Sequence, residues 1–441
     1  ASILKNGTIM NQSFIKQALQ LLQRYDSGRD ALSDILSRSA DTVITAASQI
    51  PDIQVPSGLV CGALFVVRAC DVPPKGVNSM QLVAAIQNLV SLASGKESAI
   101  PAHAVLTLGK ISLRDDRVMT RSVGILGREL RTCSNSSVRS NIVVMLCDLV
   151  MAYPLRFDQH LIWFSIAARD PDANVRFAAI SAISRLLSLD FIKMKLHIFA
   201  VLLLAAVGPI NQIAALAERT LMEALGSQLN QQLPSMTLNA MFIISGEDLV
   251  GVTRSLSVEL LGVLVESSHD TRCRALKLAV GHMSEEQKLS FASAVTNEII
   301  VPVSENCLFM SRAERCLLDT IVLLAHILST RRRRAALSNE LRGELNVSSK
   351  KGMHPKALEA TMLSWEKVIS NIVGERLVPA FAELKVVLES NKSPVQRDFM
   401  HLFLQLLDDY PEPVTRALAL MPDLLSYLEY HRQRPNGRRV A

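Results

Sequence analysis

Basic side chains gather in one stretch of the sequence, residues 331–356. This stretch holds eight Lys or Arg and two Glu, so its net charge of +6 equals the formal net charge of the whole chain. Guanidinium and ammonium groups bind phosphate oxygens, and no aromatic side chain is interleaved on which a base could stack. The stretch therefore predicts contact with DNA phosphates, without readout of the bases, through Arg331, Arg332, Arg333, Arg334, Lys350, Lys351 and Lys356.

Two other interpretations of this basic stretch stay open, a solvated linker and a nuclear import signal. No apolar stripe continues after Leu345, so we expect a loop there. The C-terminal tail is also basic, with Arg432, Arg434, Arg438 and Arg439 after Glu429.

No catalytic motif is found in the sequence. Ser94-Gly95-Lys96 lacks the preceding glycine and strand of a phosphate-binding loop, and neither H-E-x-x-H nor G-x-S-x-G occurs. The nine histidines are scattered singly, and we interpret His160, His197 and His326 as core residues because each lies in an apolar helical pattern. We therefore expect no enzyme, no cofactor, no metal site and no small-molecule substrate.

The cysteines and the apolar runs indicate in which cellular compartment the chain is expected and whether it contacts a membrane. Seven cysteines form no C-x-x-C pair, which favours buried thiols in a reducing compartment. The longest apolar run, Phe199–Val207, is far shorter than the roughly 20 residues that span a bilayer, so we expect no membrane contact. The chain begins with Ala1 inside an apparently helical pattern, and we expect it to be part of a longer protein.

The clearest structural pattern lies between Asp170 and Lys195. Asp170-Pro171-Asp172 is a turn signal followed by a helix, because Pro is excluded from helix interiors and Asp caps helix starts. An apolar stripe then recurs at helical spacing, at Val175, Ala179, Ile183, Leu186 and Leu187.

This pattern is repeated along the chain. Ile100, Val138, Val175 and Ile213 occupy matching places at intervals of 37–38 residues, which is typical of an array of helical hairpins. The first helices of the pairs are expected over Arg117–Thr132, Leu155–Arg169 and Phe191–Val207. Apolar residues make up 49% of the chain and aromatic residues only 5%, as stacked aliphatic helices require. We therefore predict an all-α fold of stacked antiparallel helical hairpins, an α-solenoid.

The residues that open the central helix resemble part of a HEAT repeat. D-P-x-x-x-V-R places Asp170 in the turn and Arg176 in the second helix, and Arg139 holds the same place in the preceding copy. The resemblance implies a ladder in which Asp and Arg bond between neighbouring repeats. Because Cys133 and Gly208 stand where Asp170 stands in the other copies, we expect apolar stacking to contribute most of the stability.

Six regions follow from these patterns, and their boundaries are set by breaks in periodicity and charge. They are degenerate helical repeats at 1–95, regular HEAT repeats at 96–226, divergent helical hairpins at 227–330, a basic linker or loop at 331–356, C-terminal helical repeats at 357–430 and a basic tail at 431–441.

The order of motifs in the regular block resembles one family, the HEAT-repeat D-type subunit of condensin. The resemblance lies in His103–Val118, Val138–Leu161, Ala168–Lys195 and Gln212–Leu221. Ser267–Val295 and Gly374–Tyr410 are similar to the condensin II form, so the chain is identified as a C-terminal part of such a subunit.

The resemblance implies a non-catalytic scaffold that binds the kleisin subunit and the SMC ATPase subunits of condensin. It also implies contact with double-stranded DNA or chromatin, location in the nucleus on chromosomes, and a role in chromosome condensation and segregation. A generic HEAT-repeat adaptor of a transport or coat complex is the alternative. It explains the repeats equally well but explains neither the order of the motifs nor the basic stretch.

Overall fold

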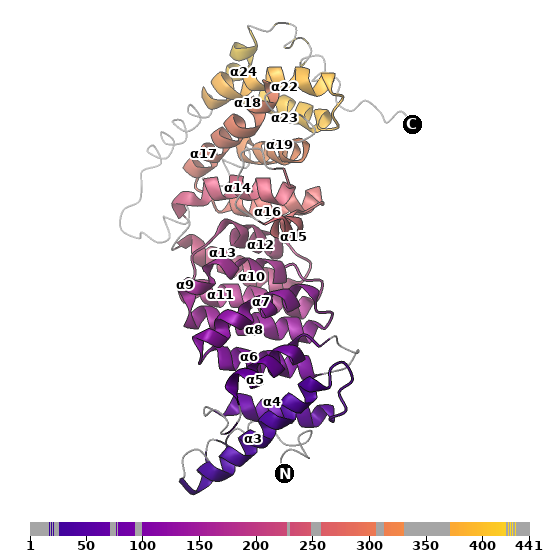
Figure 1. The fold of residues 1–441 in the computed structure, drawn as a ribbon. Helices are drawn as coiled ribbons and strands as arrows, with labels where there is room; N and C mark the ends of the chain where they lie inside the picture. Colours follow the sequence, from indigo (N-terminus) through magenta and orange to yellow (C-terminus); the bar gives the residue numbers. More distant parts are fainter. Residues whose placement is uncertain are drawn as a thin grey trace, which may run out of the picture. The chain divides into compact units, whose positions relative to one another are not determined.

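The protein is described from a computed structural model in which every regular element of the described residues is helical. The described residues are 17, 19, 21, 26–70, 76, 78–92, 99–226, 230–247, 257–305, 313–329, 371–419, 422, 424, 426 and 428. None of the helices in these ranges is both long and apolar enough to cross a lipid bilayer. The predicted all-α fold of HEAT-repeat type is confirmed (Figure 1).

The chain divides into two compact units, residues 1–194 (unit 1) and 195–441 (unit 2). The division falls inside the block 96–226 that the sequence marks as regular. The six predicted regions themselves remain a prediction.

Unit 1 contains stacked helical hairpins in two layers. α4, α6, α8 and α11 contact one another in that order in one layer, and α5, α7 and α10 form the other (Figure 1). Each hairpin joins neighbouring helices across the layers, as in α5 with α6 and α7 with α8. The helices are α3 Asp26–Ser48, α4 Ser57–Ala69, α5 Ser79–Val90, α6 Ile100–Ser112, α7 Asp116–Thr132, α8 Ser136–Ala152, α9 Pro154–Phe157, α10 Ile162–Ala167 and α11 Ala173–Ser188.

The central helix, α11, forms as its sequence predicts. Asp172 caps it by accepting hydrogen bonds from the backbone N–H groups of Asn174 and Val175. The apolar stripe is buried, with 0% exposure at Val175, Ala179, Ile183 and Leu186 and 8% at Leu187. Burial of this stripe against α8 and α10 provides the hydrophobic stabilisation of the repeat.

Two expected helices differ from the prediction. The stretch Leu155–Arg169 is broken into α9, a 3-10 turn over Asp158–His160, and α10. The helix expected from Phe191 begins at Leu196, because the chain turns at Asp190, where φ is 57°. Both departures lie in connections, where local turn geometry overrides apolar spacing.

Two glycines allow close packing in unit 1. A Cβ atom added at Gly127 on α7 would lie 2.3 Å from the ring of Trp163 on α10. One added at Gly109 on α6 would lie 2.2 Å from the sulfur of Met145 on α8. Each glycine therefore lets a large side chain of the next hairpin lie directly on the helix backbone.

Unit 2 also consists of packed helices. α16, α19 and α23 contact one another in a row, and α14 packs against α16 and α17 (Figure 1). The spacing of Ser284 and Gln287 in the sequence predicts a capping box at the start of α17. It is present, because the Ser284 hydroxyl accepts from the Gln287 N–H while the Gln287 side chain accepts from the Ser284 N–H. The α-helices are α12 Leu196–Ala206, α13 Asn211–Ala224, α14 Leu233–Ser245, α15 Val258–Leu264, α16 His269–Gly281, α17 Glu285–Val295, α18 Val301–Ser304, α19 Glu314–Leu328, α22 Val378–Ser390, α23 Gln396–Asp409 and α24 Pro411–Leu418, with π-helical turns at Thr296–Ile300 and Val373–Leu377.

Candidate functional site

The residues predicted to contact DNA lie outside the described part of the chain. They are Arg331, Arg332, Arg333, Arg334, Lys350, Lys351 and Lys356. Their role remains a prediction.

The three predicted ladder residues of unit 1 come together at the turn before α11. Arg139, on α8, donates from Nε to Oδ2 of Asp170 at 2.7 Å and from Nη2 to Oδ1 at 2.8 Å. Arg176, on α11, donates from Nη1 to the Asp170 carbonyl at 2.7 Å. Asp170 thus links α8 to the turn inside the following hairpin, between α10 and α11.

Arg139 also fixes its own turn. Its Nη1 donates to the carbonyls of Cys133 and Ser134, at 2.8 and 3.1 Å. The hydrogen bond to Asp170 raises the pKa of the Arg139 guanidinium, although burial acts in the opposite direction. Arg139 is only 8% exposed, and its guanidinium is satisfied by one carboxylate and two carbonyls.

Unit 2 contains a second ladder that the sequence did not reveal. Arg272, on α16, donates from Nε to Oδ2 of Asp319 at 2.7 Å and from Nη2 to Oδ1 at 3.2 Å. Its Nη1 donates to the carbonyls of Glu266 and Ser267, at 3.0 and 3.1 Å. Like Arg139, it therefore bonds the carbonyls six and five residues before it.

A local signal for the second ladder exists in the sequence. Arg139, Arg176 and Arg272 are each the fourth residue of their helix, after a residue whose side chain caps the helix start. Thr271 replaces the valine that precedes the other two arginines, which hides the match. The acidic partner could not be found locally, because Asp319 lies 47 residues away within α19.

Three residues at the second ladder, His269, Cys273 and Asp319, lie close enough together to be considered as metal ligands. They are the one such group among the described residues. His269 Nδ1 lies 2.8 Å from Asp319 Oδ1, and Cys273 Sγ lies 3.8 Å from the same oxygen. Arg272 already bonds both carboxylate oxygens, and burial together with Asp319 raises the pKa of the Cys273 thiol to about 12. A neutral thiol and a charge-compensated carboxylate are poor ligands, so we assign this cluster to the ladder.

A groove of about 300 Å³ lies between α16, α19 and α23 in unit 2. One ammonium group, one carboxylate and two imidazoles lie along it, so it suits a polar ligand better than an apolar one. Its lining residues are Lys277, Ile321, Val322, Ala325, His326, Ser329, Asp398, His401, Leu402 and Gln405.

The three histidines interpreted as core residues have different environments. His197 is buried on α12, as predicted. His160 is half-buried and stacks on Trp163 with ring centroids 4.4 Å apart, and His326 is half-buried and lines the groove. The interpretation is wrong for these two, because an apolar helical pattern does not determine which face of the helix a lone histidine occupies.

Two family models match the chain. Both are described as condensin-2 complex subunit D3-like HEAT repeats, and they match residues 335–438 and 53–130. The mouse condensin-2 complex subunit D3 is 26% identical over 350 residues, which cover 78% of this chain and 23% of that protein.

Plant and amphibian relatives give a similar result. The Arabidopsis thaliana condensin-2 complex subunit CAP-D3 is 23% identical, over 75% of this chain and 25% of its own length. The Xenopus laevis subunit D3-L is 23% identical, over 76% of this chain and 23% of its own length. The chain thus spans about a quarter of the length of the curated relatives it matches.

Among solved structures, yeast importin-beta (Kap95p) aligns with 99% of this chain and 56% of its own, at 13% identity and a TM-score of 0.32. A score this low supports no statement about function. The predicted resemblance rests instead on the family models and the curated relatives. It is confirmed as a similarity, since about three quarters of the chain resembles the D3 subunit of condensin II and two stretches match HEAT-repeat models of that subunit.

Proposed function

We propose that this chain is a non-catalytic HEAT-repeat scaffold of a condensin II type complex, which acts in chromosome condensation and segregation. Its partners would be the kleisin subunit and the SMC ATPase subunits, and it would contact double-stranded DNA or chromatin in the nucleus. The observation that carries the proposal is the similarity to condensin-2 D3 subunits of a mammal, an amphibian and a plant along about three quarters of the chain.

The geometry is compatible with a scaffold. Paired arginines and carboxylates connect neighbouring hairpins and helices. In the group His269, Cys273 and Asp319, the charge of the carboxylate is compensated by Arg272. Stacked helices present long faces on which an extended segment of another protein can lie. This supports binding rather than chemistry as the role of the described helices.

Co-purification tests the proposal. The protein is tagged in its own cells, and the proteins that remain bound are identified by mass spectrometry in dividing and non-dividing cells. We expect SMC ATPases and a kleisin among them. Recovery of vesicle-coat or transport proteins instead, with neither condensin component, would support the adaptor alternative.

DNA contact is tested separately on the basic stretch. Replacing Arg331–Arg334 with Ala is expected to weaken binding of a duplex and to lower the slope of log affinity against log salt, by up to about 0.9 for each phosphate that the protein no longer neutralises. Unchanged affinity and slope would leave these arginines to a linker or an import signal.

A further inference from the structure

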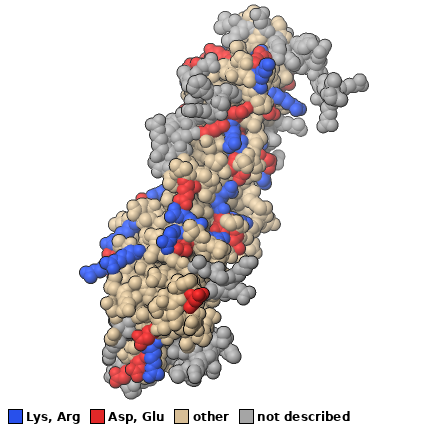
Figure 2. Space-filling view, turned by 45° about the vertical axis from the view of Figure 1, so that its right-hand side comes forward, with Lys and Arg blue, Asp and Glu red and all other residues tan. Residues whose placement is uncertain are grey.

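On the face of the molecule drawn in Figure 2, the charged side chains do not form one broad patch. On the face drawn in Figure 2, Lys and Arg side chains are intermixed with Asp and Glu. A surface for a polyanion has therefore to be sought in smaller groups, such as one face of a single helix.

The exposed face of α7, in unit 1, is such a group. Arginines at positions 117, 121, 128 and 131 recur at helical spacing opposite the buried apolar residues of the same helix. This arginine face contains four guanidinium groups and no carboxylate. Its members are all the exposed residues of α7: Arg117, Thr120, Arg121, Gly124, Arg128, Arg131 and Thr132.

The acidic groups near this face are largely engaged. Glu129 is buried and accepts hydrogen bonds from Arg128, at 3.0 and 3.1 Å. Asp116 pairs with Arg156 of α9, and the Asp115 side chain caps the start of the helix. Within the described residues, Arg117 and Arg121 make no side-chain ion pair or hydrogen bond, so neither guanidinium is held by an internal partner.

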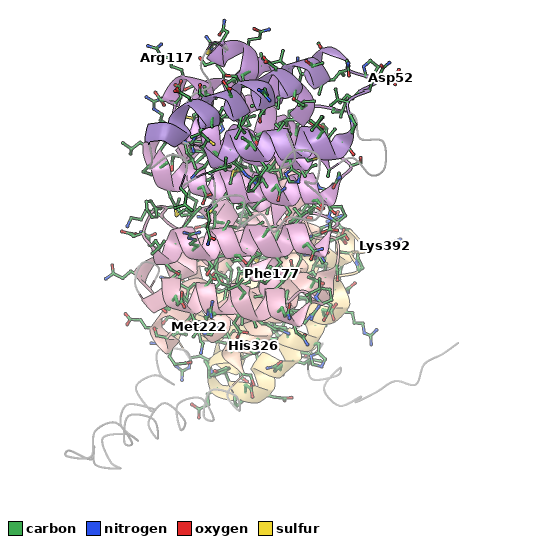
Figure 3. All side chains as sticks on the ribbon, turned by 90° about the horizontal axis from the view of Figure 1, so that it is seen from below. Asp52, Arg117, Phe177, Met222, His326 and Lys392 are labelled. Carbon is green, nitrogen blue, oxygen red and sulfur yellow. The ribbon has the colours of Figure 1, made fainter. Side chains whose placement is uncertain are left out.

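One described neighbour of the arginine face adds no opposing charge to it. α5, the neighbour of α7 in the same layer, contains no charged residue. Ser91, just after α5, accepts a hydrogen bond of 2.6 Å from Arg128. Arg117 lies at the outer edge of the ribbon in Figure 3.

The dimensions of the arginine face match a nucleic-acid duplex. Its first and last arginines are 14 positions apart, or about 21 Å at 1.5 Å per residue. A DNA duplex presents about one negative charge per 1.7 Å of its axis, so several phosphates lie within that length. A Cβ atom added at Gly124 would meet nothing within 4 Å, so a phosphate chain can approach the middle of the face closely.

We propose that the arginine face of α7 is a second surface that binds the phosphates of double-stranded DNA. This surface is separate in sequence from the predicted contact at residues 331–356. The proposal rests on the proposed function, because that function names DNA as the partner. Since the face has no apolar side chain to anchor a peptide, its chemistry favours phosphates over an acidic protein segment. Contact through phosphates alone predicts binding that is insensitive to base sequence and sensitive to salt.

The test is a double substitution, R117A with R121A, in the full chain. Both side chains are exposed and without an internal partner, so the circular dichroism spectrum and the Tm should not change. With two fewer phosphates neutralised, the salt slope should fall by about 1.8, which corresponds to about 30-fold weaker binding of a short duplex at about 0.15 M salt. R117K with R121K should retain most of the slope, because the charge is kept.

A matched control comes from unit 2. R219A with R274A removes two exposed arginines that lie on α13 and α16, so the net charge of the chain falls by the same amount. Duplex affinity of this control should stay within about twofold of that of the unchanged protein. Equal losses in both double variants would mean that overall charge, not the arginine face, governs binding, and would overturn the inference.

Failure of the inference about the arginine face can be distinguished from failure of the proposed function. If R117A with R121A binds duplex like the unchanged protein while the Arg331–Arg334 variant is weakened, the inference is wrong and DNA contact through residues 331–356 stands. If the unchanged protein binds no duplex at all, both are wrong. Tighter binding of a phosphopeptide than of a duplex at the arginine face would also overturn the inference.

Discussion

The two ladders bond their arginines in the same way but place their carboxylates differently. Asp170 lies in the turn between α10 and α11, and its side chain is 8% exposed. Asp319 lies within α19, and 0% of its surface is exposed. Arg139 and Arg272 each bond one carboxylate and the carbonyls six and five residues before them. The arginine and its turn are thus the part that the two ladders share, whereas the carboxylate comes from a turn in one ladder and from a helix in the other.

Burial should determine how much each carboxylate contributes. Removing one partner of a buried ion pair leaves the other charge uncompensated, which costs more the less water can reach it. The side chain of Arg272 is 2% exposed and that of Arg139 is 10% exposed. The unit 2 ladder should therefore be the more sensitive of the two.

The largest effect should come from the apolar stripe, not from either ladder. Ile183→Asp places an unpaired carboxylate at a position with 0% exposure, which costs several kcal/mol and should unfold at least the local repeats of unit 1. Urea unfolding followed by circular dichroism measures the loss. Asn174→Asp, on the exposed first turn of the same helix, is the control and should leave stability nearly unchanged. A similar loss in both variants would mean that the buried face is assigned wrongly.

Asp319→Asn should have the next largest effect. It keeps the size of the side chain but leaves Arg272 buried without a counter-charge, at a cost of about 3–5 kcal/mol. Native-state proteolysis should then show opening within residues 195–441. Asp270→Asn removes the exposed partner of Arg274 on the same helix and should change the Tm very little. If the two variants lose stability equally, burial does not set the contribution of the ladder.

Asp170→Ala should cost less, about 0.5–2 kcal/mol, as the loss of one turn and ladder residue. The side chains of Arg139 and Asp170 are 10% and 8% exposed, against 2% and 0% for Arg272 and Asp319, so water can better hydrate the guanidinium that is left unpaired. Chemical denaturation of this variant beside Asp319→Ala tests the comparison directly. An Asp170→Ala loss that equals or exceeds the Asp319→Ala loss would reverse the proposed order of the two ladders.

The smallest effect concerns pH and is tested on one thiol of unit 2. Burial, then Asp319, raises the pKa of the Cys273 thiol from 9.0 to about 12, so the folded state favours the neutral thiol. The resulting stabilisation is fully present below pH 9 and is lost as the pH rises from about 9 to about 12, because the unfolded chain releases the proton first. Cys273→Ser should show a shallower loss of stability over this range. An unchanged pH profile would exclude a role for this thiol.

Sequence reasoning succeeded where the cause of structure is local. The stripe of α11, the Asp172 cap and the Ser284–Gln287 capping box each depend on residues within one or two helical turns, and all are present. The buried thiols were also largely anticipated, since Cys70, Cys147, Cys273 and Cys316 are buried, whereas Cys61 and Cys133 are half-buried.

Sequence reasoning failed where the cause of the structure is a contact between residues distant in sequence, or lies in a connection between helices. The pairing of Arg272 with Asp319 depends on how α16 packs on α19, and no spacing within either helix predicts it. The close approach of Trp163 to Gly127 also depends on packing between hairpins. The arginine face of α7 was within reach of the sequence, but it emerges only when the arginines are placed around the helix axis rather than counted along the chain. The role of the basic stretch at residues 331–356 is still a prediction.

The arginine face has a chemical consequence for control. Its four cations are all arginines, which are not targets of lysine acetylation, so acetylation cannot reduce their charge. Two exposed threonines, Thr120 and Thr132, lie among them. A phosphate ester on either hydroxyl would add about two negative charges next to the guanidinium groups and compete with any external anion. On such a surface, reversible control can act through the hydroxyl groups while the cations themselves remain constant.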